Sequence, residues 1–364
     1  MGQPKLQLVE MKALVWEAPR VMAMREQAMP QPQSHEVVIK VAYAGICGSE
    51  LSGYLGHSSL RVPPLVMGHE FSGEIIALGS QTLQPSNPQT FQPSNFPTLQ
   101  LGQSVTVNPI ISCGECVYCK QGKAHLCLRR KVIGAHVAGA YAEVIVVPAA
   151  SVLPLPAGLS PRIGALTEPT ACAVRIAEMA GIGSDLRDQI VLVVGAGPIG
   201  LLAMQVLMLR GAKQVFISDL GAERLEMARA LGGLPFNPKE ADVVQVAREA
   251  TGGLGVIATV DAVGSAITRK TCVQATRNAG TVVLTGLHEE TSAMPVAEMI
   301  RREITGKGCF AYSPENFAEA LALLAAGSIR LDPWIVEAPL AEGGAWFDRL
   351  IDAPGNVAKV LLIP

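Results

Sequence analysis

Apolar positions change their spacing about halfway along the chain. Residues 35–80 contain short β-type runs such as EVVIKVAYAG and FSGEIIALG, separated by Gly and Pro turns. From about residue 165, apolar strands instead alternate with helical runs: IVLVV at 190–194 precedes a helical run over 198–210, and QVFIS at 214–218 precedes another. Alternating strands and helices are typical of a doubly wound parallel sheet. We therefore predict an α/β protein with a largely β domain and a parallel-sheet domain.

The alternation continues toward the C-terminus. It predicts a strand in GVIATVDAVG, a helix near 265–277, a strand over 281–287, and helices near 294–303 and 314–326. The last residues, VAKVLLIP, again predict a strand, which we expect to return to the first domain. Two segments depart from this pattern. Residues 1–10 predict a short extension or an early strand, and residues 82–100 repeat an uncharged Pro/Gln/Ser/Asn octad that predicts a low-complexity surface loop.

Residues 190–209 are almost wholly apolar and are long enough to span a bilayer. Four residues of a Gly-Ala-Gly-Pro-Ile-Gly motif interrupt them, which favours a different explanation. In a GxGxxG motif between a strand and a helix, Gly195 permits the tight turn, Gly197 lets a pyrophosphate approach, and Gly200 lets the helix pack on the strand. Pro198 and Ile199 open the helix, whose free N–H groups and dipole favour phosphate. The motif predicts a dinucleotide site and no membrane span.

Asp219 ends the next strand, nineteen residues beyond Gly200. Its carboxylate would accept hydrogen bonds from the adenosine ribose and repel a 2′-phosphate, which favours NAD over NADP. Arg224 follows nearby and is expected to border the adenine. Val263 and Gly286 lie at the ends of two further predicted strands. Because strand carboxyl ends line the cofactor crevice, we expect both to contact the nicotinamide.

Composition narrows the class of partner. The 364 residues carry 29 Lys and Arg against 31 Asp and Glu, a net charge of −2, and this balance argues against nucleic acid as a partner. The first twenty residues lack the continuous apolar core of a signal peptide, so we expect a cytoplasmic protein with reduced thiols. Eight cysteines are present. Where they cluster, metal binding is a better explanation than disulfides.

Four of these cysteines lie within fifteen residues. Cys113, Cys116, Cys119 and Cys127 are separated by two, two and seven residues. Four thiolates at such short spacing can complete a tetrahedral zinc site that leaves no coordination position open. We therefore predict a structural zinc in a lobe at 113–127.

A second set of possible ligands is scattered along the chain. Cys47 lies in GICGSE, His69 in GHE, and Glu168 in LTEP. A thiolate, an imidazole and a carboxylate would supply three protein ligands and leave one position open, as a catalytic zinc requires. Their spacing alone does not show that they meet.

The ordered motifs resemble those of the zinc-dependent medium-chain alcohol dehydrogenases. Residues 11–364, apart from the 82–100 insertion, carry G-I-C-G-S, G-H-E, a four-cysteine lobe, E-P, GxGxxG and a C-terminal K-V-L in the family order. G-H-E-F-S-G and T-E-P-T-A look most like the polyol and secondary-alcohol branch, which includes sorbitol, butanediol and galactitol-1-phosphate dehydrogenases. The resemblance implies a GroES-like catalytic domain at 1–166 and 312–364, and a Rossmann domain at 167–311.

The resemblance also implies the chemistry. Two zinc ions per chain, one catalytic and one structural, would serve an NAD-dependent oxidation of a secondary alcohol or polyol, free or phosphorylated, to a ketone. Cys47 and His69 would hold the catalytic zinc with either Glu70 or Glu168, and Glu50 would orient the histidine. Homodimers and homotetramers are the family's assemblies.

Proton transfer in the family begins at a hydroxyl that matches Ser49. The histidine that often continues the relay is replaced here by Ser52, so His57, Glu70 or water would have to take its place.

Two alternative functions remain open: oxidation of an amino alcohol, as in threonine dehydrogenases, and cofactor binding without catalysis. The complete Cys47, His69 and Glu168 set argues against the second.

Overall fold

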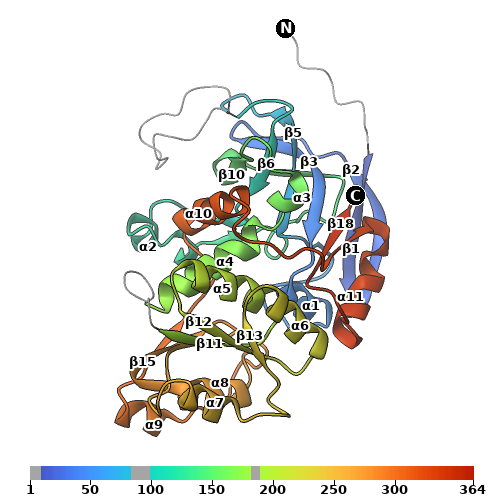
Figure 1. Cartoon of the computed structure of the whole chain (residues 1–364). Coiled ribbons are helices and arrows are strands. Elements are labelled where there is room, and N and C mark those ends of the chain that lie inside the picture. Colours follow the sequence, from blue (N-terminus) through green and yellow to red (C-terminus); the bar gives the residue numbers. More distant parts are fainter. Residues whose placement is uncertain (1–9, 83–98, 182–188) are drawn as a thin grey trace. The chain divides into compact units, whose positions relative to one another are not determined.

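The computed structural model describes residues 10–82, 99–181 and 189–364, and its contacts divide the chain into two units (Figure 1). Unit 1 comprises Met1–Glu168 and Ile335–Pro364, and unit 2 comprises Pro169–Trp334. The chain therefore returns to its first unit after an inserted second one. That return lies at Ile335, whereas the sequence placed it at residue 312.

Side-chain bonds explain why the second unit extends beyond residue 311. Helix α10 (Pro314–Ala325) is held by Asn316, whose Nδ2 donates to Glu178 Oε2 at 2.9 Å. Arg210 Nη2 lies 2.5 Å from Glu319 Oε1 on the same helix. Polar links between residues so distant in sequence leave no trace in hydropathy, so the amphipathic run at 314–326 predicted a helix but not its domain.

Unit 1 is built mainly from antiparallel strands. Its larger sheet has the order β10-β6-β5-β3-β18-β17, with β9 also paired to β3, and a second sheet has the order β2-β1-β4. The strands of the larger sheet are β3 (Glu36–Gly45), β5 (Glu70–Leu78), β6 (Ser104–Val107), β9 (Val144–Pro148), β10 (Val152–Pro154), β17 (Ile335–Pro339) and β18 (Lys359–Ile363). The smaller sheet contains β1 (Glu10–Ala18), β2 (Val21–Ala28) and β4 (Leu65–Val66). The predicted C-terminal strand is thus β18, which lies beside β3.

Short elements complete unit 1. They are α1 (Gly48–Tyr54), β7 (Ile110–Ile111), α2 (Val117–Lys120), η1 (Ala124–Leu126), β8 (Lys131–Val132), η2 (Ala149–Ser151), α3 (Pro161–Gly164), η3 (Leu340–Glu342) and α11 (Gly343–Asp352). Its core collects apolar side chains from both sheets, including Trp16, Phe71 and Phe347. Burial of such aromatic side chains is the main stabilising term for a β domain of this kind.

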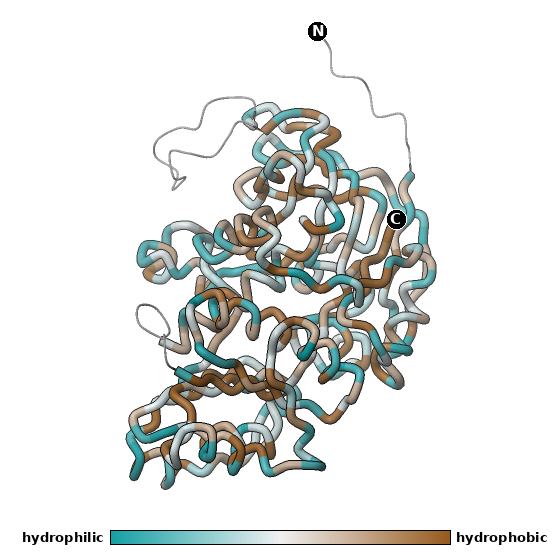
Figure 2. The backbone as a smooth tube through the Cα atoms, viewed as in Figure 1, coloured by the Kyte–Doolittle hydropathy of each residue, from teal (hydrophilic) through white to brown (hydrophobic). Residues whose placement is uncertain are grey.

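Unit 2 contains a six-stranded sheet in which every pair is parallel. The strand order is β13-β12-β11-β14-β15-β16, as predicted for a doubly wound fold. The strands are β11 (Ile190–Val194), β12 (Gln214–Ser218), β13 (Leu234–Phe236), β14 (Val256–Asp261), β15 (Thr276–Leu284) and β16 (Thr305–Gly308). Figure 2 shows the central strands as strongly hydrophobic (brown). A parallel sheet that is covered on both faces buries both sides of each strand, so these strands are apolar throughout.

Helices alternate with these strands. They are α4 (Thr167–Met179), α5 (Pro198–Leu209), α6 (Ala222–Ala230), α7 (Val243–Glu249), α8 (Ala266–Ala275), α9 (Val296–Arg301) and α10. Local sequence sets several of their first turns: Asp242, Ser265 and Ser313 each accept a hydrogen bond from a backbone N–H group of the helix that follows.

The apolar run over 190–209 is divided between β11 and α5. Throughout the three described ranges, every helix falls short of the length and apolar character that a bilayer crossing demands. Residues 1–9 and most of the 82–100 loop lie outside the described residues, so both predictions about them stay predictions.

Candidate functional site

Three possible metal ligands converge in unit 1. Cys47, His69 and Glu70 each offer a donor atom, and these atoms all lie within 4.8 Å of one another. Strand pairing brings them together, because β3 and β5 are antiparallel and place Gly45 opposite Glu70. Cys47 follows the end of β3, and His69 precedes the start of β5. A spacing of 22 residues thus becomes a contact through sheet register.

Glu70 lies in an unusual electrostatic setting. Its carboxylate is fully buried, and Oε2 forms an ion pair with Lys359 Nζ at 2.5 Å, while Oε1 has no hydrogen-bond partner within the described part of the chain. Burial lowers the pKa of Lys359, but the charge of the Glu70 carboxylate and its hydrogen bond outweigh burial and raise the pKa. A buried carboxylate oxygen without a partner is costly unless a cation binds there. Together with the thiol and the imidazole, it fits a zinc ion.

Glu50 holds the same cluster in place through hydrogen bonds to the segments that carry Cys47 and His69. Its Oε1 lies 2.7 Å from His69 Nδ1 and 2.9 Å from the backbone N of Gly68, and its Oε2 accepts from the backbone N of Cys47 at 3.1 Å. With Nδ1 occupied, Nε2 of His69 is the nitrogen left for a metal. Burial raises the pKa of Glu50, but His69, Arg61 and the hydroxyl of Tyr141 together lower it to about 2. The carboxylate is therefore ionised.

Ser49 is exposed beside the cluster. Its Oγ lies 3.5 Å from Cys47 Sγ and accepts a hydrogen bond from Nη2 of the buried Arg61 at 3.3 Å. Arg61 also donates from Nη1 to the Ser49 backbone oxygen at 3.1 Å and from Nε to the Gly134 backbone oxygen at 3.3 Å. The arginine therefore fixes the serine hydroxyl at the rim of the site.

Glu168, the other carboxylate that the sequence offered, is nearly buried at the start of α4. Among the described residues, the cluster of mutually close donors contains Glu70 and does not contain Glu168. Between the two alternatives that the sequence left open, the geometry therefore favours Glu70. Tyr54, the last residue of α1, is buried, and its hydroxyl donates to the Arg20 backbone oxygen at 2.9 Å, so it belongs to the core.

The four-cysteine lobe forms a second cluster. The sulfur atoms of Cys113, Cys116, Cys119 and Cys127 all lie within 4.8 Å of one another, with pairs at 3.4, 3.5 and 3.9 Å. Four thiolates around one zinc would be about 3.8 Å apart, given Zn–S bonds of about 2.3 Å in a tetrahedron. Backbone N–H groups of Glu115 and Cys116 lower the pKa of Cys113 to about 6, which favours the thiolate. The lobe fits a structural zinc.

In unit 2, the glycine motif has the geometry that a dinucleotide site needs. Gly195 has a φ of +104°, and a β-carbon on Gly200 would lie 1.8 Å from the Gly195 oxygen. Only glycine is free of strain at the first position, and only glycine fits at the second. Within the described residues, no atom lies within 4 Å of a β-carbon placed on Gly197, so the backbone there is open to a ligand. Pro198 and Ile199 form the first turn of α5.

Asp219 lies at the carboxyl end of β12, beside the glycine loop. Its Oδ2 accepts from the Ala196 backbone N at 2.7 Å, and its Oδ1 accepts from the Gly221 backbone N at 2.9 Å. Arg224 Nη1 is 3.9 Å from Oδ2, and its expected place at the adenine stays a prediction. Asp219 thus also supports the glycine loop, a role that sequence analysis did not identify.

Val263 and Gly286 lie at the same edge of the sheet. A β-carbon on Gly286 would lie 2.1 Å from the Val263 carbonyl carbon, and one on Gly195 would lie 2.7 Å from Val263 Cγ2. The ends of β11, β14 and β15 therefore meet, as expected for a crevice at strand carboxyl ends.

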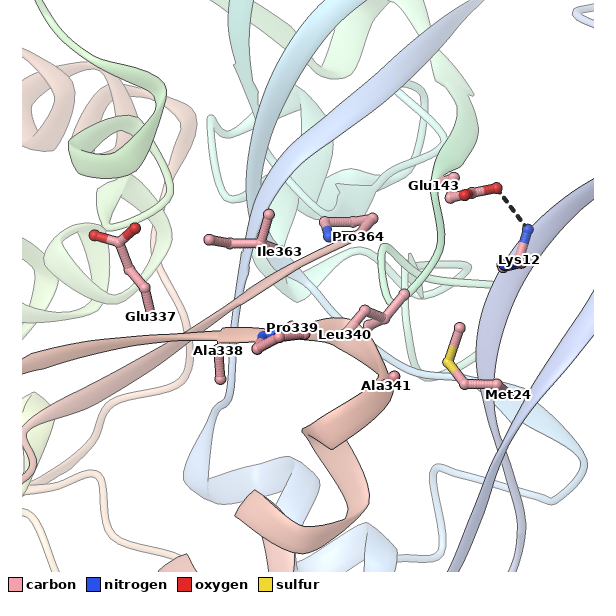
Figure 3. A pocket seen from close by; sticks show the side chains of 10 residues that line it. All are labelled: Lys12, Met24, Glu143, Glu337, Ala338, Pro339, Leu340, Ala341, Ile363 and Pro364. Carbon is pink, nitrogen blue, oxygen red and sulfur yellow. Dashed lines mark hydrogen bonds between the residues drawn. The ribbon is translucent and has the colours of Figure 1, made fainter.

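An apolar groove of about 460 Å³ lies elsewhere on unit 1 (Figure 3). Its walls include Met24, Leu340 and Ile363, and Lys12 at its rim donates its backbone N–H to Glu143 at 2.7 Å. None of the residues lining it belongs to the metal clusters or to the glycine loop. The chemistry-bearing residues are therefore not in this groove.

Three residues that surround the metal cluster escaped sequence analysis: Arg61, Tyr141 and Lys359. Each is buried: Arg61 bonds to Ser49, Tyr141 bonds to Glu50, and Lys359 forms an ion pair with Glu70. Lys359 belongs to the C-terminal K-V-L motif used for the family resemblance, but sequence analysis gave it no role at the site, although its apolar context in VAKVLLIP indicated a buried charge.

Comparisons with known proteins agree with this geometry. Residues 33–157 match the family model described as alcohol dehydrogenase GroES-like domain, and residues 198–326 match that of zinc-binding dehydrogenase. L-galactonate-5-dehydrogenase of Escherichia coli (strain K12) is 33% identical over 323 residues, 88% of this chain and 89% of that protein. D-arabitol-phosphate dehydrogenase of Enterococcus avium is 32% identical over 359 residues, 97% of each. The crystal structure of a putative zinc-binding dehydrogenase from Sinorhizobium meliloti 1021 bound to NADP is similar with a TM-score of 0.87 and 29% identity, covering 98% of this chain and 100% of that one.

Proposed function

The chain belongs to the zinc-dependent alcohol dehydrogenase family, and from this premise we propose that it oxidises a secondary alcohol of a polyol or sugar acid, free or phosphorylated, with NAD. The observation that carries the proposal is the convergence of Cys47, His69 and Glu70 in one cluster, together with the absence of a hydrogen-bond partner for Glu70 Oε1 among the described residues. Relatives named for galactonate and arabitol phosphate support a substrate with several hydroxyl groups and a negative charge.

Cys47, His69 and Glu70 would hold the catalytic zinc, and the four cysteines of the lobe would hold the structural one. The chemistry that the bound groups supply is Lewis-acid polarisation of the alcohol by zinc and acceptance of a hydride by the nicotinamide. Glu50 holds His69 in the tautomer that presents Nε2. Ser49 Oγ is exposed beside Cys47 and would take the proton of the alcohol. Glu70 is buried and paired with Lys359, which suits a ligand better than a proton relay to solvent.

The dinucleotide would lie on the glycine loop of unit 2. Gly197 leaves room for the pyrophosphate, and Pro198 and Ile199 begin the helix whose N–H groups face it. The carboxylate of Asp219 would oppose a 2′-phosphate, which supports NAD as the preferred cofactor. Arg224 lies 3.9 Å from that carboxylate, so charge repulsion by Asp219 is partly offset.

Turnover of one substrate panel tests the proposal. The panel contains polyols, polyol phosphates, aldonates and threonine, each offered with NAD and with NADP, alongside zinc analysis of the purified chain. We expect about two zinc per chain and activity on a hydroxylated acid or phosphate with NAD. Turnover of threonine alone would establish the amino-alcohol alternative, a preference for NADP would refute the role of Asp219, and two zinc without any turnover would favour a binding protein.

We also propose that the enzyme is a cytoplasmic homodimer or homotetramer. None of the eight cysteines, all of which lie in the described part of the chain, forms a disulfide, which supports a reducing compartment. In unit 2, β16 is an edge strand, and Val296 and Ile300 of the preceding helix are exposed, which supports association there. Light scattering at micromolar concentration tests this, and a monomer would contradict it.

A further inference from the structure

Tyr141 lies next to the metal cluster, and its hydroxyl bonds to Glu50 and to the backbone of Gly45 rather than to a proposed ligand. Its hydroxyl donates a short hydrogen bond to Glu50 Oε2 and lies 3.1 Å from the Gly45 backbone oxygen. The side chain is fully buried. Burial, together with the carboxylate of Glu50, raises the pKa of Tyr141, so the hydroxyl keeps its proton and remains a donor.

The tyrosine is itself held by the fold. Its backbone N donates to the Met67 oxygen at 2.9 Å, and its backbone oxygen accepts from the Leu14 N at 2.8 Å. The ring packs edge-on against Phe347, with ring centroids 6.0 Å apart. Side chains fixed in this way by packing and backbone bonds can hold a functional group in place.

Glu50 needs this fourth bond. The other three donors to its carboxylate are the His69 ring and the backbone N–H groups of Gly68 and Cys47. All three belong to the segments that carry the proposed ligands. Tyr141 is the donor that belongs to neither segment, so it ties the carboxylate to the rest of the domain.

We propose that Tyr141 is a positioning residue for the catalytic metal site. Its hydroxyl holds the Glu50 carboxylate, and that carboxylate in turn keeps Cys47 and His69 in place. This inference rests on the proposed zinc site. Without the hydroxyl, one carboxylate oxygen would lose a charge-assisted donor, and both ligand segments would gain freedom together. Mutation of residues that orient metal ligands typically lowers metal affinity by about 10–100-fold.

Zinc release to a chromogenic chelator tests the proposal on the full-length zinc-loaded protein. Two release phases are expected, and the phase missing in Cys47→Ala identifies the catalytic metal. We expect Tyr141→Phe to release that metal about 10-fold faster and the lobe metal at the wild-type rate. Phenylalanine keeps the ring that packs on Phe347, so the variant retains its fold.

Tyr54→Phe is the matched control. Tyr54 is also buried in unit 1 and packs on Phe347 at 5.1 Å, but its hydroxyl bonds to the Arg20 backbone oxygen and to Asp348 instead of Glu50. It should lose thermal stability as Tyr141→Phe does but release both metals as the wild type does. Equal release of the catalytic metal by the two variants would overturn the role of Tyr141. A wild-type protein with a single zinc would instead refute the proposed catalytic site.

A second measurement uses the cobalt-substituted protein. Because ligand-field bands report the geometry around the ion, we expect the spectrum of Tyr141→Phe to shift while that of Tyr54→Phe stays unchanged. Identical spectra for both variants and the wild type would also overturn the inference.

Discussion

The two clusters of metal-binding residues are built in opposite ways. In the lobe, four like ligands come from one loop of fifteen residues, Cys113 to Cys127, and their sulfur atoms surround a closed position. In the other cluster, three unlike proposed ligands come from just after β3 and from the start of β5, and Lys359 of β18 forms an ion pair with one of them, Glu70. The spacing of cysteines within one loop is enough to predict the four-cysteine site. The three-residue site forms only when the register of β3 and β5 brings its residues together.

The largest expected effect is on catalysis, from Cys47→Ala. The variant should lose one of two zinc ions and about 1,000-fold or more in kcat/KM, because loss of the Lewis acid removes several kcal/mol of transition-state stabilisation. Metal analysis and steady-state kinetics measure both. Cys272→Ala, which removes a buried thiol from unit 2, is the control and should keep both zinc ions. If Cys47→Ala still held two zinc ions, Cys47 would not be a ligand, and the contrast between the two clusters would fail.

Ser49→Ala should lower kcat by roughly 100-fold while both metals stay, because it removes the group that takes the proton and no ligand. The measurement is the rate of alcohol oxidation at saturating substrate. Ser52→Ala, which removes a hydroxyl from the same helix, is the control. An unchanged rate in Ser49→Ala would remove Ser49 from the mechanism.

Glu70→Gln and Glu168→Gln separate the two candidate carboxylates. We expect Glu70→Gln to weaken binding of the catalytic zinc at least about 10-fold, as measured by competition with a chelator, and Glu168→Gln to leave it unchanged. The opposite result would make Glu168 the ligand.

Glu70→Gln also leaves Lys359 as a buried charge without its partner, which destabilises a protein by about 3–5 kcal/mol. The double variant Glu70→Gln with Lys359→Met removes that charge. It should regain thermal stability without regaining zinc affinity. Recovery of both would show that Glu70 acts only as the partner of Lys359.

The smallest effect on catalysis is expected from Cys127→Ser. The lobe should lose its zinc, and the melting temperature should fall by about 5 °C or more, while the rate per folded chain stays near that of the wild type. Differential scanning calorimetry and activity at 25 °C measure the two quantities. A large loss of activity in fully folded protein would mean that the lobe supports the catalytic cluster.

Sequence analysis reached furthest where the chemistry is local. The lobe, the glycine motif and Asp219 follow from spacing within one loop or one strand–helix unit, and the parallel sheet follows from the alternation of elements. The choice between Glu70 and Glu168 could not be made in this way, because it depends on which residue faces Gly45 across two strands. The sequence also did not place the return to unit 1 at Ile335, because it does not show that α10 packs with unit 2, where Arg210 lies beside Glu319.

The residues around the ligands were the hardest to foresee. Arg61, Tyr141 and Lys359 act on groups that are 12, 91 and 289 residues away in the chain. Nothing in their local sequence marks an arginine, a tyrosine or a lysine as part of a metal site. Their roles arise from burial, which makes every polar atom require a partner.

The place of Lys359 in the last strand has a consequence for biosynthesis. A ribosome finishes the four-cysteine lobe 232 residues before it adds Lys359. At about 5–20 residues per second, that interval is on the order of 10 to 50 s. The lobe can acquire its metal on the nascent chain, whereas the Glu70 carboxylate remains without its counter-charge until Lys359 has been added. A chain truncated just before Lys359 would therefore contain every proposed ligand and still lack the positive charge that pairs with Glu70.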